Sequence, residues 1–297
     1  MAPAREQVAR KHAVDLLDEL NIASLPVSPE DILSRKKIVL EERSDFPPEV
    51  FGAISYANSR FTIYISTACP TPGHRRFTLA HELGHYHIDG HIDARIQAGT
   101  EVSPSLGGHY RGRKDPLEVE ADAFASELLM PRRLVAPLVA RAGKELLGTA
   151  LRVADAAKAS LLAAAIRTVE LMDGLGAVIV SHRGAVEWAS FSPALWSYDF
   201  ARRSWKGEWA PRASGAARLA RDPGSVSRGD RADSGLLVPE WFEGAPPSYE
   251  VEEESVGLGS YGRVLTALRI PYLPDPDSLY LQRQRERDEE FREERER

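Results

Sequence analysis

The chain has 297 residues, a length that predicts about two domains. Apolar residues make up 43% of it and charged residues 28%, close to the averages for soluble globular proteins, which excludes collagen-like and wholly disordered chains. The net charge of −6 argues against a protein that coats nucleic acid, and the single cysteine, Cys69, excludes a disulfide framework and a cysteine-built zinc site. Any metal chemistry must therefore use His, Asp and Glu.

Membrane and export signals are not found in the sequence. No apolar run approaches the length of about 18 residues that a membrane helix needs. Residues 1–14 are charged and lack the apolar core of a secretory signal. We therefore expect a cytoplasmic protein.

The N-terminal region predicts two helices followed by strands. Apolar positions recur at helical spacing over 5–20, and the sequence Ser-Pro-Glu-Asp at 28–31 predicts the start of a second, short helix. Segments 37–41, 51–56 and 60–66 have strand character, and the last of them alternates apolar and polar residues as a half-buried strand does. If this strand has a free edge, an extended peptide could pair with it; a core position is the alternative.

Two longer helices follow, with a loop between them. A capping threonine and a proline at 71–72 open a helix that we expect to run through His85. Residues 91–114 are rich in glycine and predict a long loop, and the pair at 115–116 opens the next helix, which ends near Pro131.

The composition of the remaining sequence changes twice. An alanine- and leucine-rich stretch predicts short helices, and a predicted β-hairpin begins at Leu175. We therefore predict an α+β protein of four parts. These are a domain at 1–131 with a small mixed sheet, a helical connector or helix-turn-helix-like domain at 132–172, an α+β domain at 173–281 and a charged tail at 282–297.

The helix that starts at Pro72 contains the pattern H-E-x-x-H at His81-Glu82-Leu83-Gly84-His85. Residues four apart lie on one helical face, so both imidazoles can reach one zinc ion with Glu82 beside it. A glutamate there can take a proton from water and later give one to a leaving amine. The alternative is a surface helix with two incidental histidines.

A catalytic zinc needs a third protein ligand. His91 has the spacing of the third histidine in metzincins, but that pattern needs glycine at position 88 and this sequence has Ile88. His91 is therefore the weaker candidate.

The next helix offers carboxylates instead. Glu118 and Asp122 are four apart on one face, which suits a glutamate ligand and an aspartate that holds the second N–H of a histidine. Glu118 could instead form a capping box with Asp115, and Asp122 could lie on a solvated face. Glu120 is a fallback ligand.

Other candidates have weaker support. His109 and Tyr110 could stabilise an oxyanion from the predicted loop, although a solvated basic loop is the favoured interpretation. His87 is expected to pack or face solvent, and Cys69 to be inert. Basic residues recur in the helical region, at Arg132, Arg133, Arg141, Lys144, Arg152, Lys158 and Arg167. We expect a solvated face there, ahead of docking to a repressor or direct DNA binding.

Together these segments resemble a known family. Residues 76–85, Arg-Phe-Thr-Leu-Ala-His-Glu-Leu-Gly-His, are followed by Glu118-x-x-Ala121-Asp122-x-Phe124-Ala125 and by Leu-Leu-Met-Pro at 128–131. Two such blocks in this order resemble the ImmA/IrrE family of zinc metallopeptidases over roughly residues 5–135. The resemblance implies a gluzincin-like, zincin-type fold, with His81, His85 and Glu118 as ligands and Glu82 as general acid/base. Asp122 stands where the family often has Asn or Asp.

The resemblance also implies a substrate and a cofactor. Members of the family cleave helix-turn-helix repressors, often of the XRE type and encoded nearby, and so induce stress-response or mobile-element genes. Some carry a helical domain and a GAF-like sensor domain, which 132–171 and 173–281 would match; 253–255 and 261–266 resemble a segment common in the family. We expect one catalytic Zn²⁺, although Mn²⁺ or Fe²⁺ could use the same ligands.

Two other functions fit the same residues. One is a regulatory module that binds a ligand or protein and has a structural or vestigial metal site. The other is a peptidase of a toxin–antitoxin system. No residue of the C-terminal region identifies its ligand.

Overall fold

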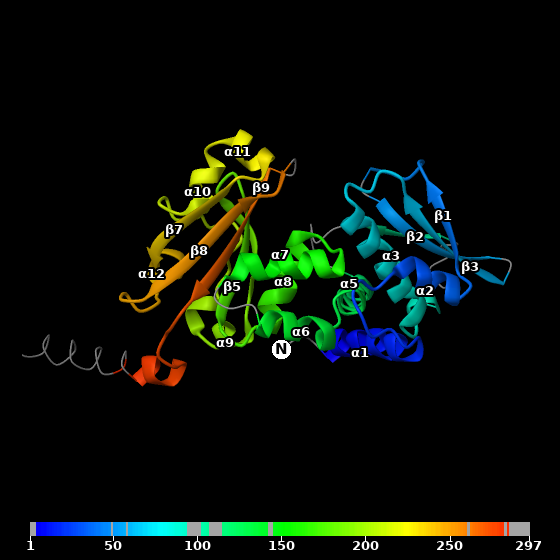
Figure 1. Ribbon diagram of the computed structural model, residues 1–297, viewed down its shortest axis with the longest axis horizontal. Helices are drawn as coiled ribbons and strands as arrows, with labels where there is room; N and C mark the ends of the chain where they lie inside the picture. The colour runs from blue at the N-terminus through cyan, green and yellow to red at the C-terminus, as the bar shows by residue number, and fades with distance from the viewer. Residues whose placement is uncertain are drawn as a thin grey trace, which may run out of the picture. The chain divides into compact units, whose positions relative to one another are not determined.

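The computed structural model describes residues 4–48, 50–57, 59–93, 102–106, 115–141, 145–259, 262–281 and 284. The chain divides into two compact units. Unit 1 comprises Met1–Arg141 and Gly148–Thr168, and unit 2 comprises Ala142–Leu147 and Val169–Arg297. Each unit has its own sheet with helices around it, which confirms the predicted α+β class (Figure 1). The four-part division at 131, 172 and 281 stays a prediction, and nearly all of the charged tail lies outside the described residues.

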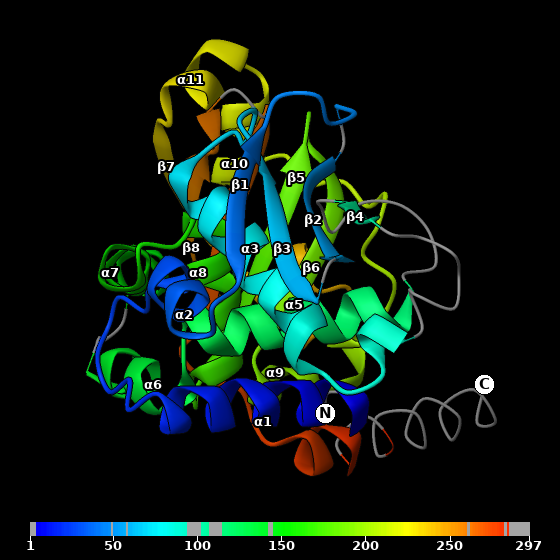
Figure 2. The same cartoon turned by 90° about the vertical axis from the view of Figure 1, so that its right-hand side faces the viewer.

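Unit 1 contains a small mixed sheet. Its strands are β1 (Val39–Arg43), β2 (Val50–Ala57), β3 (Arg60–Ser66) and β4 (Val102–Leu106), in the order β1-β3-β2-β4. β1 runs parallel to β3, and the other neighbours are antiparallel. β3 therefore lies inside the sheet (Figure 2), which favours the core position for 60–66 over the free edge. The partner that covers its second edge, β1, comes from outside the β2–β3 hairpin.

β4 lies within 91–114, which the sequence predicted as loop. It pairs antiparallel with β2, and Pro104 stands opposite Ala53. Proline lacks the N–H that a central strand needs, so it is tolerated mainly on edge strands. The position of β4 at the sheet edge explains how a strand with proline and little β-propensity can form there.

The helices of unit 1 begin where the sequence predicted. α1 spans Ala4–Glu19 and α2 spans Pro29–Arg35; the Ser28 hydroxyl caps α2 by accepting a hydrogen bond from the backbone N–H of Asp31 at 3.2 Å. α3 (Pro72–His87) is capped in the same way by Thr71. α5 (Pro116–Leu129) is capped by Asp115, which accepts from the N–H of Leu117 at 3.0 Å.

α3 packs against β2, β3 and α5 (Figures 1 and 2). Leu79, Leu83 and Phe124 are fully buried between these elements. The two helices approach closely at Gly84, where an added Cβ would lie 3.2 Å from the Cα of Ala121 and from the Phe124 ring. A small residue at this position therefore sets how near α5 comes to α3.

Three further helices follow α5. They are α6 (Arg132–Ala140), α7 (Leu146–Ala157) and α8 (Leu161–Leu171). α8 is joined to α5 through the buried guanidinium of Arg167, whose Nε donates to the carbonyl of Met130 at 3.0 Å and whose Nη2 pairs with Glu127. Because both charges are buried and paired, the carboxyl end of α5 depends on α8.

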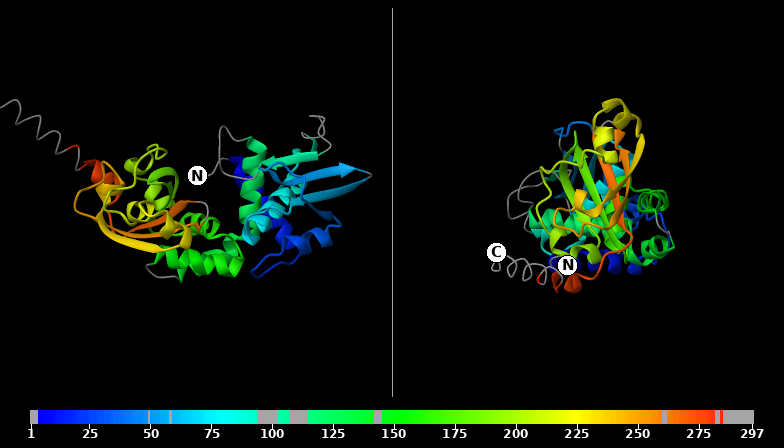
Figure 3. Two further views of the ribbon diagram at one scale, coloured as in Figure 1. Left: turned by 90° about the horizontal axis from the view of Figure 1, so that it is seen from above. Right: turned by 90° about the vertical axis from the view of Figure 1, so that its left-hand side faces the viewer.

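Unit 2 is built on a five-stranded antiparallel sheet in the order β6-β5-β9-β8-β7 (Figures 1 and 3). The strands are β5 (Leu175–His182), β6 (Ala185–Phe191), β7 (Arg231–Leu237), β8 (Glu250–Gly257) and β9 (Arg263–Ile270). The short helices are α9 (Pro193–Trp196), η1 (Asp199–Ala201), α10 (Gly215–Ala220), α11 (Pro223–Arg228) and α12 (Val238–Trp241). The β5–β6 pair is the hairpin predicted from the sequence, with Gly184 at φ 88° in its turn.

Among the described residues of unit 2, one acid is fully buried: Glu253, whose exposed fraction is 2%. Its carboxylate accepts hydrogen bonds from the N–H of Ala216 at 3.1 Å, the indole of Trp241 at 3.2 Å and the hydroxyl of Ser255 at 2.8 Å, and from the hydroxyl of Ser234. These bonds join α10 and α12 to β7 and β8. A GAF-like character for this unit stays a prediction.

No helix among the described residues is both long and apolar enough to cross a bilayer.

Candidate metal centre

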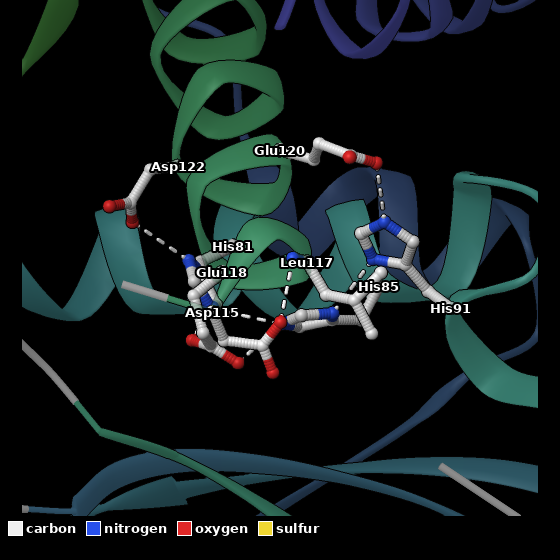
Figure 4. Close-up of polar contacts among 8 residues, drawn as sticks. All are labelled: His81, His85, His91, Asp115, Leu117, Glu118, Glu120 and Asp122. Atoms are coloured by element: carbon white, nitrogen blue, oxygen red, sulfur yellow. Dashed lines mark hydrogen bonds and ion pairs between the residues drawn. The ribbon is translucent and has the colours of Figure 1, made fainter. Parts of the chain in front are cut away.

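α3 carries the three residues of the H-E-x-x-H pattern and presents its two histidines toward α5. His81, Glu82 and His85 are all buried, with exposed fractions of 6%, 0% and 0%. The Nε2 atoms of the two histidines lie 3.1 Å apart. The helical spacing therefore does what the sequence predicted and brings both imidazoles to one point (Figure 4).

Glu118 reaches the same point from the first turn of α5. Its Oε2 lies 3.1 Å from Nε2 of His81 and its Oε1 lies 3.4 Å from Nε2 of His85. Donor atoms of the three residues all lie within 4.8 Å of one another, close enough to hold one metal ion. Two imidazole nitrogens and one carboxylate are a donor set found in catalytic metal sites with an open position. The residues present therefore fit a metal ion.

Asp122 lies one helical turn after Glu118 and contacts the other side of His81. Its Oδ1 is 3.0 Å from Nδ1 of His81 (Figure 4). A carboxylate accepts hydrogen bonds only, so Nδ1 carries the proton and Nε2 faces Glu118 and His85.

The electrostatics of this cluster favour positive charge at its centre. Burial lowers the pKa of His81, but hydrogen bonds with Asp122 and Glu118 outweigh burial and raise it to about 10. Burial raises the pKa of Glu118, and the hydrogen bonds from His81 and His85 outweigh this and bring it well below its usual range. The carboxylates around His81 thus favour positive charge at the point where a metal ion would sit.

Glu82 lies under strand β2, at Gly52. A Cβ added to Gly52 would lie 2.7 Å from Oε1 of Glu82 and 2.5 Å from Cγ2 of Thr78. Only glycine leaves room for the carboxylate in this place. Sequence reasoning did not single out Gly52; a glycine within the predicted strand 51–56 was the one signal that a close approach could occur there.

His91 and Glu120 were alternative ligands, and the structure places both outside the three-residue cluster. Nδ1 of His91 lies 3.0 Å from Nδ1 of His85, on the side of that ring away from Glu118. Nε2 of His91 lies 3.1 Å from Oε2 of Glu120. His91 thus contacts His85, and Glu120 contacts His91 (Figure 4).

The remaining candidates lie elsewhere. His109 and Tyr110 are outside the described residues. The ring of His87 stacks on Phe124 at 6.0 Å between centroids, and burial lowers its pKa to about 4, so it is a packing residue. Burial raises the pKa of the Cys69 thiol, which disfavours the reactive thiolate.

Comparison with known proteins identifies the domain. No curated protein matches the chain significantly. A solved structure, a transcriptional regulator from Mycobacterium tuberculosis, is similar with a TM-score of 0.54 and 14% sequence identity, over 90% of this chain and 76% of that one; this shows a shared fold. Residues 40–168 match the family model of the IrrE N-terminal-like domain, Peptidase_M78. Residues 40–168, which include α3 and α5, are therefore a Peptidase_M78 domain of the ImmA/IrrE family, as the two sequence blocks predicted.

Proposed function

We propose that this chain is a zinc-dependent endopeptidase that cleaves a regulatory protein. The observation that carries the proposal is the convergence of His81, His85 and Glu118 within 4.8 Å, with Glu82 buried on the same helix. The match to a peptidase family model over the segment that contains these residues supports it.

The Nε2 atoms of His81 and His85 and the carboxylate of Glu118 would hold the ion. A zinc ion in such a site supplies Lewis-acid chemistry, which polarises a peptide carbonyl and lowers the pKa of water. Zn²⁺ suits two imidazoles and one carboxylate; Mn²⁺ and Fe²⁺ accept the same donors, so metal analysis decides among them.

Glu82 would be the general base and then the general acid. Its carboxylate takes a proton from the attacking water as the new C–O bond forms, and gives that proton to the amine nitrogen as the C–N bond breaks. Burial at Gly52 holds the carboxylate in one place and keeps bulk solvent from competing for its proton.

The proposed substrate is an XRE-type helix-turn-helix repressor encoded nearby, whose cleavage would induce stress-response or mobile-element genes. The family resemblance supports this substrate. A toxin or antitoxin partner would present the same peptide chemistry, so the substrate assay has to include both.

A regulatory module without peptidase activity is the second candidate. The similar solved protein is described as a transcriptional regulator, and the likeness extends over 90% of this chain. A structural zinc would need a closed set of four protein ligands. His91 was the residue that could have closed it, and it contacts Nδ1 of His85 instead, which favours the peptidase.

Incubation of the full chain, loaded with zinc, with the neighbouring repressor separates these functions. We expect cleavage by the wild type and a decrease of about 10²–10⁴-fold in rate for Glu82→Gln, because general acid–base catalysis contributes that much. Glu82→Gln should still bind one zinc ion, since Glu82 is not a ligand. Asp15→Asn, an exposed carboxylate of the same unit, is the matched control and should cleave normally. Cleavage by Glu82→Gln at the wild-type rate would contradict the mechanism.

A further inference from the structure

A hydrogen-bonded chain of buried side chains runs from His85 away from the proposed metal. Nδ1 of His85 lies 3.0 Å from Nδ1 of His91, and Nε2 of His91 lies 3.1 Å from Oε2 of Glu120. We propose that His91 and Glu120 are positioning residues that hold His85 in the tautomer needed to bind the metal. This inference rests on the proposed metal site and adds the device that orients its second histidine.

The direction of each hydrogen bond in this series follows from the carboxylate at its end, Glu120. The Glu120 carboxylate accepts hydrogen bonds only, so Nε2 of His91 donates. In a neutral imidazole the other nitrogen is then an acceptor, so Nδ1 of His91 accepts from Nδ1–H of His85. With its Nδ1 proton held by His91, His85 can release the proton that Nε2 shares with Glu118 and offer the Nε2 lone pair to the metal. The opposite order would place a proton on Nε2 and block the metal.

The backbone explains why His91 arrives behind His85 and not beside it. α3 ends at His87; Ile88 after it is extended, with φ/ψ of −82° and 123°, and Gly90 turns the chain at φ 83°. Only glycine adopts that left-handed conformation without strain. The turn comes two residues later than the glycine of the metzincin pattern, and it brings His91 to the Nδ1 side of the ring.

Burial makes this contact chain rigid. The exposed fraction of His91 is 1% and that of Glu120 is 9%, and the rings of His85 and His91 lie 5.1 Å apart between centroids. Glu120 is also held from α1 by Arg5, whose Nη1 lies 3.3 Å from its Oε1. Few alternative positions are therefore open to either side chain.

The two metal-facing histidines are thus held by the same helix in two ways. Asp122 of α5 contacts Nδ1 of His81 directly, whereas Glu120 of α5 reaches Nδ1 of His85 through His91. Such partners of metal-binding histidines typically contribute 10–100-fold to metal affinity. We assign this contribution at His85 to His91 and Glu120.

The first test measures Zn²⁺ affinity of the full chain by competition with a chromogenic chelator. We expect His91→Phe to weaken affinity about 10–100-fold, because Nδ1 of His85 loses its acceptor. Glu120→Gln should lose less, since its amide oxygen can still accept from His91. His87→Phe is the matched control, a histidine of the same helix that only packs, and should keep wild-type affinity. Equal affinities in wild type, His91→Phe and Glu120→Gln would overturn the proposal.

The second test reads the tautomer of His85 without metal, by long-range ¹H–¹⁵N NMR of the full chain. We expect the proton on Nδ1 in the wild type and in Glu120→Gln, and a loss of this preference in His91→Phe. A wild type in which Nδ1 of His85 carries no proton would overturn the inference on its own. A wild type that shows the Nδ1 proton but binds no zinc would contradict the proposed function and leave the orienting contact in place.

Discussion

Glu253 is buried in unit 2 and Glu118 is half-buried in unit 1, and the two carboxylates have partners of different kinds. Glu253 of unit 2 is surrounded by four hydrogen-bond donors from α10, α12, β7 and β8. Glu118 of unit 1 faces the nitrogens of two imidazoles, which can give up their protons and bind a cation in their place. The comparison separates a buried acid that joins parts of a fold from one that is placed for a ligand.

The geometry around each carboxylate reflects this difference. The donors on Glu253 include a backbone N–H and an indole, which cannot be exchanged for a metal ligand. Around Glu118 the donors point toward a common centre, and Asp122 and His91 hold the far nitrogens of both rings. Buried acids with fixed donors contribute to stability, whereas acids that converge with imidazoles are candidates for metal binding.

The strongest test of this comparison is Glu118→Ala. We expect it to lose stoichiometric zinc at micromolar concentrations while the chain stays folded, because a third ligand is removed and both imidazoles keep their Nδ1 partners, Asp122 and His91. Elemental analysis after dialysis measures the zinc, and circular dichroism measures the fold. Glu118→Ala protein with one bound zinc would show that the ligand assignment is wrong.

The converse change is Glu253→Ala. We expect it to destabilise unit 2 by about 3 kcal/mol, since the indole of Trp241, two hydroxyls and a backbone N–H lose their acceptor inside the core. Urea unfolding followed by tryptophan fluorescence measures this, and zinc affinity should not change. Glu252→Ala, an exposed neighbour paired with Arg269, is the control and should have a smaller effect. Similar urea midpoints for Glu253→Ala and Glu252→Ala would show that Glu253 has no such structural role.

A smaller expected effect, on activity alone, is that of Gly52→Ala. The new methyl group would collide with Glu82 and Thr78, so the carboxylate has to move from its place under β2. A displacement of about 1 Å in a catalytic group can cost about 10²-fold in rate. We expect such a decrease in the cleavage assay, with zinc retained. Gly235→Ala, at a strand position with no neighbour within 4 Å, serves as the control. Normal cleavage by Gly52→Ala would show that Glu82 does not need this space.

Parts of the site that depend on one helix could be predicted from the sequence. His81 and His85 share a face because they are four apart, and so do Glu118 and Asp122. The contacts that the sequence did not reveal depend on how distant segments meet. Gly52 matters only because β2 lies over Glu82, and His91 finds Nδ1 of His85 only because the chain turns at Gly90.

The same distinction explains what the sequence left open or missed in the fold. The alternation over 60–66 correctly indicated a strand, but whether that strand has a free edge depends on its parallel pairing with β1. The sequence did not predict β4, because its pairing with β2, and not its own residues, makes it a strand. In unit 2 the hairpin was visible as local pattern, whereas the role of Glu253 depends on partners from four elements.

The ion pair between Glu127 and Arg167 has a practical consequence for anyone who expresses the first unit by itself. A boundary placed at Pro131 would remove both Arg167 and the backbone N–H of Arg132 from the buried Glu127 carboxylate, and leave it the longer contact of 3.7 Å to Arg10. A boundary after Thr168 retains the guanidinium and coincides with the end of the matched family domain. The smallest autonomous version of this domain should therefore extend through most of α8.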